Sequence, residues 1–302
     1  MNPSPLQLRQ DSEARRAQTI RHVQIMRSLG SAGPRRKMPR ARFPREIEQD
    51  YGTALVGIVN AARRAISGLM AELPRMAPRG DARADAGEAR RVRELVHRAG
   101  QVFERAVDAR HLEDLAKRYA ERTSIWQHTE LGRQVRAQLG VDVLGTVPAS
   151  AEPTVEAFVG ENVSLIKSVG TDELSEIERI VTREFANGAR HETIAAMIAV
   201  RFEIGERRAR RIARDQVGKL NGQLAASRQQ ALGVEHFVWR SVGDIRVRGT
   251  PGGPFAGARP SHFERNGKRY AYKAPPLGEL PGMPILCRCS PEPDFADILA
   301  GL

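Results

Sequence analysis

The stretch that decides the fold opens with Glu206-Arg-Arg-Ala-Arg-Arg-Ile-Ala-Arg-Asp-Gln216 and continues at helical spacing to Leu232. It is followed by Val238-Trp-Arg-Ser-Val-Gly-Asp-Ile-Arg-Val-Arg248, then by Ser261-His-Phe-Glu-Arg-Asn-Gly267, and finally by Cys287-Arg-Cys289. The first part repeats apolar residues every three or four positions, whereas the second has short apolar runs bounded by glycine and proline. The pattern predicts a long basic helix that leads into a small β-module.

This order of elements resembles the C-terminal signature of the phage Mu F-like family of minor head proteins, also called head morphogenesis proteins. The resemblance covers residues 153–292 and rests on elements that follow one another in the family's order. They are Ile212-Ala-Arg214, Gly233-Val234, Trp239, Asp244-Ile-Arg-Val-Arg248, His262, Asn266-Gly267 and Cys287-Arg-Cys289. We therefore treat Trp239, Asp244, Arg246, Arg248, His262, Gly267, Cys287 and Cys289 as the structural signature residues of the family in this chain.

One segment departs from the family pattern. In the family the histidine follows the Arg-Val-Arg element almost at once, whereas residues 249–259 lie between the two here. Four glycines and two prolines mark this segment as an inserted loop. The insertion puts in doubt any shared geometry between Asp244 and His262.

The composition is typical of a helical protein whose own surface is basic and binds a partner. The chain has 302 residues, 41% hydrophobic residues, only 5% aromatic residues and a net charge of +12. A core built mostly from Ala, Leu, Ile and Val favours packed helices over a β-sandwich. We expect an α+β protein that is mostly α-helical, with a small C-terminal β-hairpin module, and the positive charge predicts an acidic partner.

The positive charge is concentrated in two places. Residues 1–45 hold eleven Lys or Arg residues against two acids, and we interpret this segment as a basic, partly disordered arm. A second group of positively charged residues lies within the predicted helix that begins at Glu206. We expect these cations either to be solvated or to contact DNA phosphates or the portal, and the candidates are Arg35, Arg36, Lys37, Arg40, Arg207, Arg208, Arg211 and Arg214.

No segment looks secreted or membrane-spanning. The N-terminal thirty residues contain arginines in place of an apolar core, and the longest apolar run, Ile194–Val200, is too short to cross a bilayer. The two cysteines are spaced Cys-x-Cys, which rarely permits a good disulfide between them. We expect a protein that is made in a reducing cytosol and built into a particle from there, with no membrane partner.

Three segments are predicted along the chain: residues 1–45 as the arm, 46–150 as a helical N-terminal region, and 151–302 as the Mu F-like domain. Within the last, helices are expected over 153–232 and the β-module over 236–292. Glycine, serine and proline positions predict where helices end or begin. The predicted features are a helix over Asp11–Leu29, an end at Pro74, a capped restart at Ser124, stops at Gly170, Asn187-Gly188, Gly205 and Gly233-Val234, and a linker over Gly140–Glu152.

Short strands are predicted after the long helix. They cover 237–240, 245–248, 268–272 and 285–289, with Asn266-Gly267 as a hairpin turn. Trp239 is interpreted as a core anchor of this module. Asp244 is interpreted as a residue that fixes a turn, by accepting from a backbone N–H or pairing with an arginine.

The Cys-x-Cys permits two interpretations, a zinc site or a purely structural role. Asp244, His262, Cys287 and Cys289 offer four ligand types that zinc accepts. In an extended Cys-x-Cys both sulfurs point to one side, but the shared coordination is strained compared with Cys-x-x-Cys. The sequence favours the structural interpretation, in which Cys289 is a small buried residue and His262 begins a strand, and no cofactor is expected.

No enzyme motif is present. The chain lacks a Walker loop, a Gly-x-Ser-x-Gly and a Gly-x-Gly-x-x-Gly, and a nuclease built on His262, Asp244 and Asn266 would have only Glu264 as a further nearby carboxylate. A toxin activity in residues 46–150 is disfavoured, because that segment shows helical amphipathicity without a nucleophile or phosphate loop. We expect no catalysis.

The resemblance implies a minor head protein of a tailed phage or prophage, which acts in head morphogenesis and DNA delivery. Its expected partners are the portal protein, other head proteins and packaged DNA, and its expected location is the virion, at the head interior or portal vertex. The alternative hypothesis is a free nucleic-acid-binding or nuclease-like protein.

Overall fold

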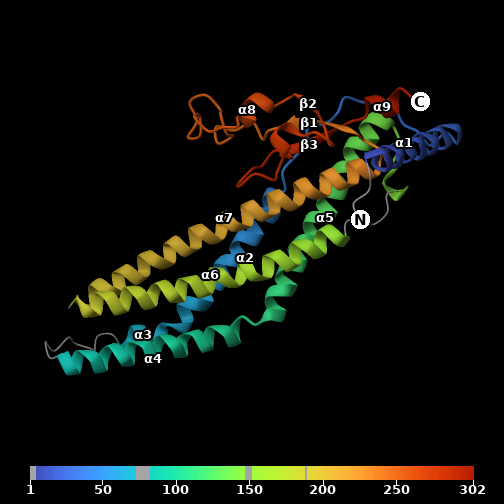
Figure 1. Ribbon diagram of the computed structural model, residues 1–302. Helices are drawn as coiled ribbons and strands as arrows, with labels where there is room; N and C mark the ends of the chain where they lie inside the picture. The colour runs from blue at the N-terminus through green and yellow to red at the C-terminus, as the bar shows by residue number, and fades with distance from the viewer. Residues whose placement is uncertain (1–4, 73–81, 147–151, 188) are drawn as a thin grey trace. The chain divides into compact units, whose positions relative to one another are not determined.

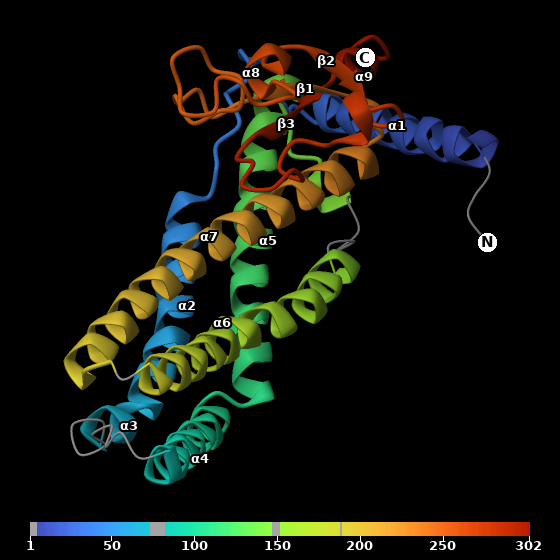
Figure 2. The ribbon, with the colours of Figure 1, turned by 60° about the vertical axis from the view of Figure 1, so that its left-hand side comes forward.

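The chain is mostly helical and carries one small antiparallel sheet near its C-terminus, which confirms the predicted fold class (Figures 1 and 2). The computed structural model describes residues 5–72, 82–146, 152–187 and 189–302. The elements are α1 (Pro5–Ser28), α2 (Arg45–Ala65), α3 (Ser67–Glu72), α4 (Ala82–Ala106), α5 (Ala109–Leu139), η2 (Leu144–Thr146), α6 (Glu152–Ala186), α7 (His191–Ala231), β1 (His236–Arg240), α8 (His262–Arg265), β2 (Arg269–Ala271), η3 (Pro276–Gly278), β3 (Ser290–Asp294) and α9 (Ala296–Leu299).

Internal packing divides the chain into two compact units, each assembled from separate segments. Unit 1 contains Met1–Ile47, Ala120–Phe158 and Asp215–Leu302, and unit 2 contains Glu48–Tyr119 and Val159–Arg214. The sequence boundaries expected at residues 45 and 150 stay predictions. Pro74 and the 147–151 part of the expected linker, together with Gly188, lie outside the described residues.

Unit 2 is an all-helical core built largely from aliphatic side chains. Its parts of α6 and α7 run side by side in both views, joined by the short turn after Ala186 (Figures 1 and 2). The rings of Tyr51 and Tyr119 stack with centroids 4.7 Å apart, and the Tyr51 hydroxyl donates to Asn162 Oδ1 at 3.3 Å. Burial raises the pKa of Tyr51 well above its ordinary value, so this hydroxyl stays a donor.

Two glycines that were expected to stop helices lie inside them, so those two predictions were wrong. α6 continues through Gly170 and α7 continues through Gly205. A Cβ at Gly170 would lie 2.0 Å from the Phe103 ring, and one at Gly205 would lie 2.8 Å from the carboxyl carbon of Glu173. Both glycines therefore allow a neighbouring side chain to pack against the helix backbone. This packing offsets the conformational entropy that a glycine loses inside a helix.

The helix break expected at Ser124 was also wrong. α5 begins earlier, after Asp108, whose carboxylate accepts a hydrogen bond from the backbone N–H of His111 at 2.8 Å. This is the geometry of a helix N-cap. Ser124 instead lies within α5, where its carbonyl and hydroxyl oxygens accept from Arg228 at 2.8 and 2.7 Å. The polar side chain of Ser124 thus serves tertiary contact and not capping.

Unit 1 is built around an aliphatic cluster to which α1, α5, α9 and the end of α7 contribute. Its buried members are Val23, Leu131, Val135, Leu139, Val141, Val143, Leu144, Leu232, Val234, Phe295 and Ile298. α1 was expected over Asp11–Leu29 and forms over Pro5–Ser28, and Gly30 follows it at φ +69°. The Thr19 hydroxyl donates to the Leu232 carbonyl at 3.0 Å, which fastens α1 to the end of α7.

The basic segment after α1 lacks regular secondary structure but is held along its backbone. Gly33 N–H donates to the Gly140 carbonyl at 2.8 Å, Arg36 N–H donates to the Ala137 carbonyl at 2.6 Å, and Arg133 donates to the Arg40 carbonyl at 2.7 Å. Arg42 binds the Glu130 carboxylate through both its backbone and its guanidinium. This part of the arm that was interpreted as partly disordered is thus hydrogen-bonded to α5 and the turn after it.

The predicted end of the long helix at Gly233-Val234 is confirmed. Gly233 adopts φ +76°, and the Val234 N–H donates to the Gln229 carbonyl at 3.0 Å, as in a Schellman cap. The sheet follows in the order β2-β1-β3, with both outer strands antiparallel to the central β1. The strand expected over 268–272 forms as β2, and the strand expected over 237–240 forms as β1.

The other two predicted strands do not form. Residues 245–248 make a turn, and β3 begins at Ser290, immediately after the segment 285–289 that was expected to be a strand. Asn266-Gly267 is not a two-residue hairpin turn, because the short helix α8 precedes it. Among the described residues no helix is long and apolar enough to span a membrane.

Candidate functional site

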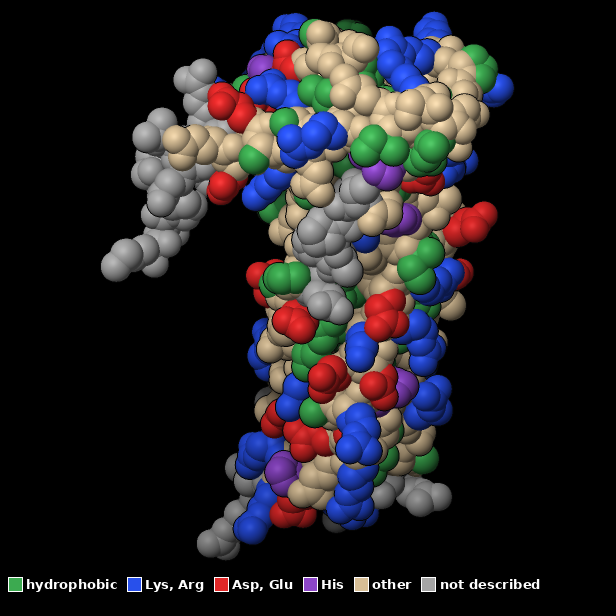
Figure 3. Space-filling view, turned by 90° about the vertical axis from the view of Figure 1, so that its right-hand side faces the viewer, with side chains coloured by type: hydrophobic (Ala, Val, Ile, Leu, Met, Phe, Trp, Pro, Cys, Tyr) green, Lys and Arg blue, Asp and Glu red, His purple; other side chains and the backbone are tan. Residues whose placement is uncertain are grey.

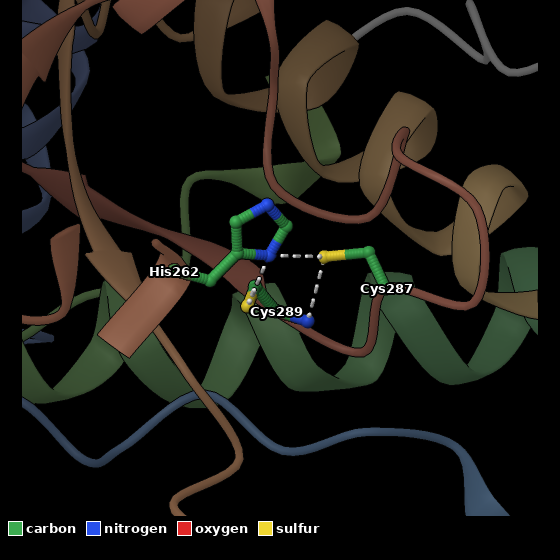
Figure 4. A group of neighbouring side chains, drawn as sticks. All are labelled: His262, Cys287 and Cys289. Atoms are coloured by element: carbon green, nitrogen blue, oxygen red, sulfur yellow. Dashed lines mark hydrogen bonds between the residues drawn. The ribbon is translucent and has the colours of Figure 1, made fainter. Parts of the chain in front are cut away.

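His262, Cys287 and Cys289 come together in the interior of the C-terminal module. The side chains are 2%, 5% and 3% exposed, and the imidazole Nδ1 lies 3.4 Å from the Cys287 sulfur and 3.7 Å from the Cys289 sulfur (Figure 4). The Cys289 backbone N–H donates to the Cys287 sulfur at 3.5 Å. The three ligating atoms lie within 4.8 Å of one another, so one point in space is accessible to all of them.

The imidazole is oriented by a short helix and a tryptophan. Ser261 caps α8, accepting from the Glu264 N–H at 3.1 Å, and His262 is the first residue of that helix. Trp239 of β1 is fully buried, and its ring meets the His262 ring edge-on with centroids 5.1 Å apart. The guanidinium of Arg265 lies 4.9 Å above the Trp239 ring. Trp239 is therefore the core anchor that the sequence indicated, whereas His262 begins a helix and not the expected strand.

The loop that carries the cysteines docks on α7 at two glycines. A Cβ at Gly218 would lie 2.7 Å from the Cys287 carbonyl oxygen, and one at Gly222 would lie 2.4 Å from the Pro281 carbonyl oxygen. The carboxylate of Asp215 accepts from the Leu286 N–H at 2.7 Å, beside these contacts. Sequence reasoning missed this docking face, although two glycines four residues apart inside a predicted helix were a signal for it.

Asp244 fixes a turn and does not join the cysteine group. Its carboxylate accepts from the Arg246 N–H at 3.0 Å and pairs with the Arg288 guanidinium at 2.8 Å. Arg288 is the middle residue of the Cys-x-Cys, so the aspartate reaches the cysteine loop through that arginine. The guanidinium of Arg248 donates to the Ile285 carbonyl at 2.8 Å and holds the same loop from the other end.

The inserted loop 249–259 closes on itself. The Gly249 N–H donates to the Phe255 carbonyl at 2.9 Å, and the Phe263 N–H donates to the Arg248 carbonyl at 3.0 Å. The chain thus returns to Arg248 immediately before His262. Despite the insertion, His262 therefore lies next to the Arg-Val-Arg turn. Gly267, which follows α8, adopts φ +81°, and its N–H donates to the Trp239 carbonyl of β1 at 2.8 Å.

The two neighbouring thiols have pKa values that are shifted in opposite directions. The hydrogen bond with Cys289, together with the neighbouring His262 imidazole, lowers the pKa of the Cys287 thiol well below its ordinary value despite burial. The same hydrogen bond, with burial, raises the pKa of Cys289 well above its ordinary value. The two thiols and the neighbouring imidazole are donors of the kinds that bind soft metal cations.

The candidate DNA or portal contacts differ in how far they are engaged in internal ion pairs. Arg35, Arg36, Lys37 and Arg40 are all exposed. On α7, Arg208 pairs with Asp172 at 2.8 Å and Arg214 pairs with Glu48 at 2.5 Å. Arg207 is exposed and 3.8 Å from Glu203, and Arg211 is exposed. Lys and Arg side chains lie among Asp and Glu side chains on the face shown in Figure 3.

Comparison with known proteins gives a family match over part of the chain. The model of the family described as Phage Mu protein F like protein matches residues 175–291. A protein of Haemophilus influenzae, named only "Uncharacterized protein", is 29% identical over 190 residues, which are 62% of this chain and 40% of that protein. This chain therefore spans well under half the length of that relative. No solved structure matches.

The matched segment contains each element on which the sequence resemblance rested, from the Ile-Ala-Arg of α7 to the Cys-x-Cys. It also contains the buried group of His262, Cys287 and Cys289, and both docking glycines of α7. The resemblance is confirmed over residues 175–291, the part of the chain that matches the model of the Phage Mu protein F like family.

Proposed function

We propose that this chain is a minor head protein of a tailed phage or prophage that associates with the portal and, through its basic residues, with packaged DNA. The family match over residues 175–291 supports a role in phage head morphogenesis. The match over residues 175–291 is the observation that carries this proposal. The family consists in general of structural head proteins, which agrees with a role in assembly and not in catalysis.

The basic segment after α1 supports the part of the proposal that concerns an acidic partner. Arg35, Arg36, Lys37 and Arg40 expose their side chains while the backbone of the segment is hydrogen-bonded to α5 and the following turn. Because the backbone is already ordered, less conformational entropy is lost when the cations bind a partner. Exposed arginine and lysine side chains suit contact with phosphates or carboxylates, which positions a protein without reading bases.

Co-purification with the portal protein encoded beside this chain tests the proposal. We expect the pair to remain together at low and high salt and after nuclease treatment, because packed helices would form the contact. Loss of the portal with retention on DNA would instead favour the free nucleic-acid-binding alternative, and loss of both would refute the proposal.

A charge-removal variant separates the basic segment from the general charge of the protein. The variant R35Q/R36Q/K37Q/R40Q removes four cations from it. The matched control R105Q/R110Q/K117Q/R118Q removes four exposed cations from α4 and α5. The first variant should reduce the salt dependence of DNA binding by up to about 0.9 in log–log slope for each phosphate that is no longer neutralised. An equal reduction by the control would show that only net charge matters.

A further inference from the structure

We propose that His262, Cys287 and Cys289 form a zinc site that ties the C-terminal module together. The sequence favoured a role without metal, because an extended Cys-x-Cys strains shared coordination. In the structure the Cys-x-Cys lies in the loop before β3, directly after a turn in which the Cys287 N–H donates to the Pro284 carbonyl at 2.9 Å. Both sulfurs lie within 3.7 Å of the same imidazole nitrogen, which removes the geometric objection.

The distances fit a shared metal ion. With Zn–S of about 2.3 Å and Zn–N of about 2.0–2.1 Å in a tetrahedron, a sulfur and a nitrogen ligand lie about 3.5 Å apart. The two sulfurs lie 3.4 and 3.7 Å from His262 Nδ1. A single ring nitrogen carries either one proton or one lone pair, so it cannot make two good hydrogen bonds to two sulfurs. A single metal ion bound by the imidazole nitrogen and both sulfurs would give each of the three atoms a partner.

The surroundings suit a structural metal site. The three side chains are nearly fully buried, and the Cys289 backbone N–H points at the Cys287 sulfur, which stabilises a metal-bound thiolate. Two thiolates and an imidazole are the donors that zinc prefers. No fourth Cys, His, Asp or Glu joins the group within the described parts of the chain.

Asp244 is excluded from the ligand set and has a supporting role. Its carboxylate is bound to Arg288, which places that arginine, and therefore the two cysteines on either side of it, against the 244–248 turn. A second group in the described residues, Glu235, His236 and Asp297, is half-buried, and arginines already neutralise its carboxylates. That group serves as an internal control for the experiment.

Metal analysis of the full chain tests the site. The protein purified with zinc and dialysed should retain about one zinc per chain, and replacement by Co²⁺ should give the visible absorption of a thiolate-ligated cobalt ion. H262N should lower zinc affinity by more than the roughly 100-fold that loss of an outer-shell partner costs. The matched control H236N should leave both zinc content and the cobalt spectrum unchanged.

Chelation of the wild-type chain provides a test that needs no variant. Removing zinc should lower the Tm, and adding zinc back should restore it. The proposal is overturned if the wild-type chain retains no zinc after dialysis, or if H236N and not H262N abolishes binding. It is also overturned if the mass of the chain purified under reducing conditions shows a Cys287–Cys289 disulfide.

Discussion

The carboxylate of Asp244 lies 2.8 Å from the guanidinium of Arg288, the residue between the two cysteines. The pair joins the Arg-Val-Arg turn to the cysteine loop, and Arg288 is mostly buried there. We expect D244N to lower the free energy of unfolding by about 1–2 kcal/mol, because a charge-assisted hydrogen bond is weakened and Arg288 loses its counter-charge. Urea denaturation measures this difference.

The control for that variant is R246Q. Arg246 contributes its backbone N–H to Asp244 while its side chain is exposed, so R246Q should change stability by less than about 0.5 kcal/mol. Equal effects of D244N and R246Q would contradict a specific role for the ion pair.

Two glycines of α6 should respond in opposite directions to alanine. G170A places a methyl group inside the Phe103 ring and should destabilise the chain by about 1–3 kcal/mol. G160A meets nothing within 4 Å and should stabilise it by about 0.5–1 kcal/mol, since alanine favours helix over glycine. Thermal unfolding of the two variants measures the contrast, and a stabilising G170A would refute the packing role of that glycine.

Glu130 should make stability depend on pH in the acid range. Burial alone would raise its pKa, but hydrogen bonds from Arg133 and Arg42 outweigh burial and lower the pKa below its ordinary value of 4.5. A carboxyl with a lowered folded-state pKa contributes stability above its unfolded pKa and loses it as the pH falls through the folded value. E130Q should thus cost about 1–3 kcal/mol at neutral pH and progressively less below pH 4.5.

Denaturant unfolding of wild type and E130Q between neutral pH and about pH 3 measures this dependence, since acid titration of paired carboxylates spans that range. A constant difference between the two proteins across the range would show that the carboxylate contributes through its shape and not through its charge.

Arg228 should be a large single contributor to the stability of unit 1. It is buried and donates to the Ser124 carbonyl and hydroxyl and to the Gln127 side chain, at 2.8, 2.7 and 2.5 Å. R228A should cost about 2–4 kcal/mol, because it leaves buried acceptors without donors. The stability of R228K should lie between those of the wild type and R228A, since one ammonium group cannot reproduce the planar, forked hydrogen bonding of the guanidinium. Chemical denaturation of both variants orders them, and a neutral R228A would contradict the assignment.

The sequence was informative wherever a local rule decides the structure. The end of α7 at Gly233 follows from one glycine that can adopt positive φ and cap the helix with its own backbone. The amphipathic helices, and the order of the histidine and the two cysteines, were likewise readable from spacing.

Distant partners decided the features that the sequence could not predict. A glycine in a helical pattern can either end the helix or let another side chain pack closely against it. At Gly170 and Gly205 the outcome depends on Phe103 and Glu173, which lie far away in the sequence. For the same reason the hydroxyl of Ser124 accepts a hydrogen bond from Arg228 and does not cap the start of a helix. The group of His262 with both cysteines depends on how α8 and the loop before β3 pack together, which no periodicity encodes.

The chain contains only the two cysteines of this group, and both are buried. A thiol-reactive reagent can therefore modify the native protein only when the C-terminal module opens. In the regime where the module opens and closes faster than the reagent reacts, the rate of labelling reports the free energy of that local opening. The chain thus carries its own reporter, with no engineered label, for whether the module becomes more rigid when it enters an assembly.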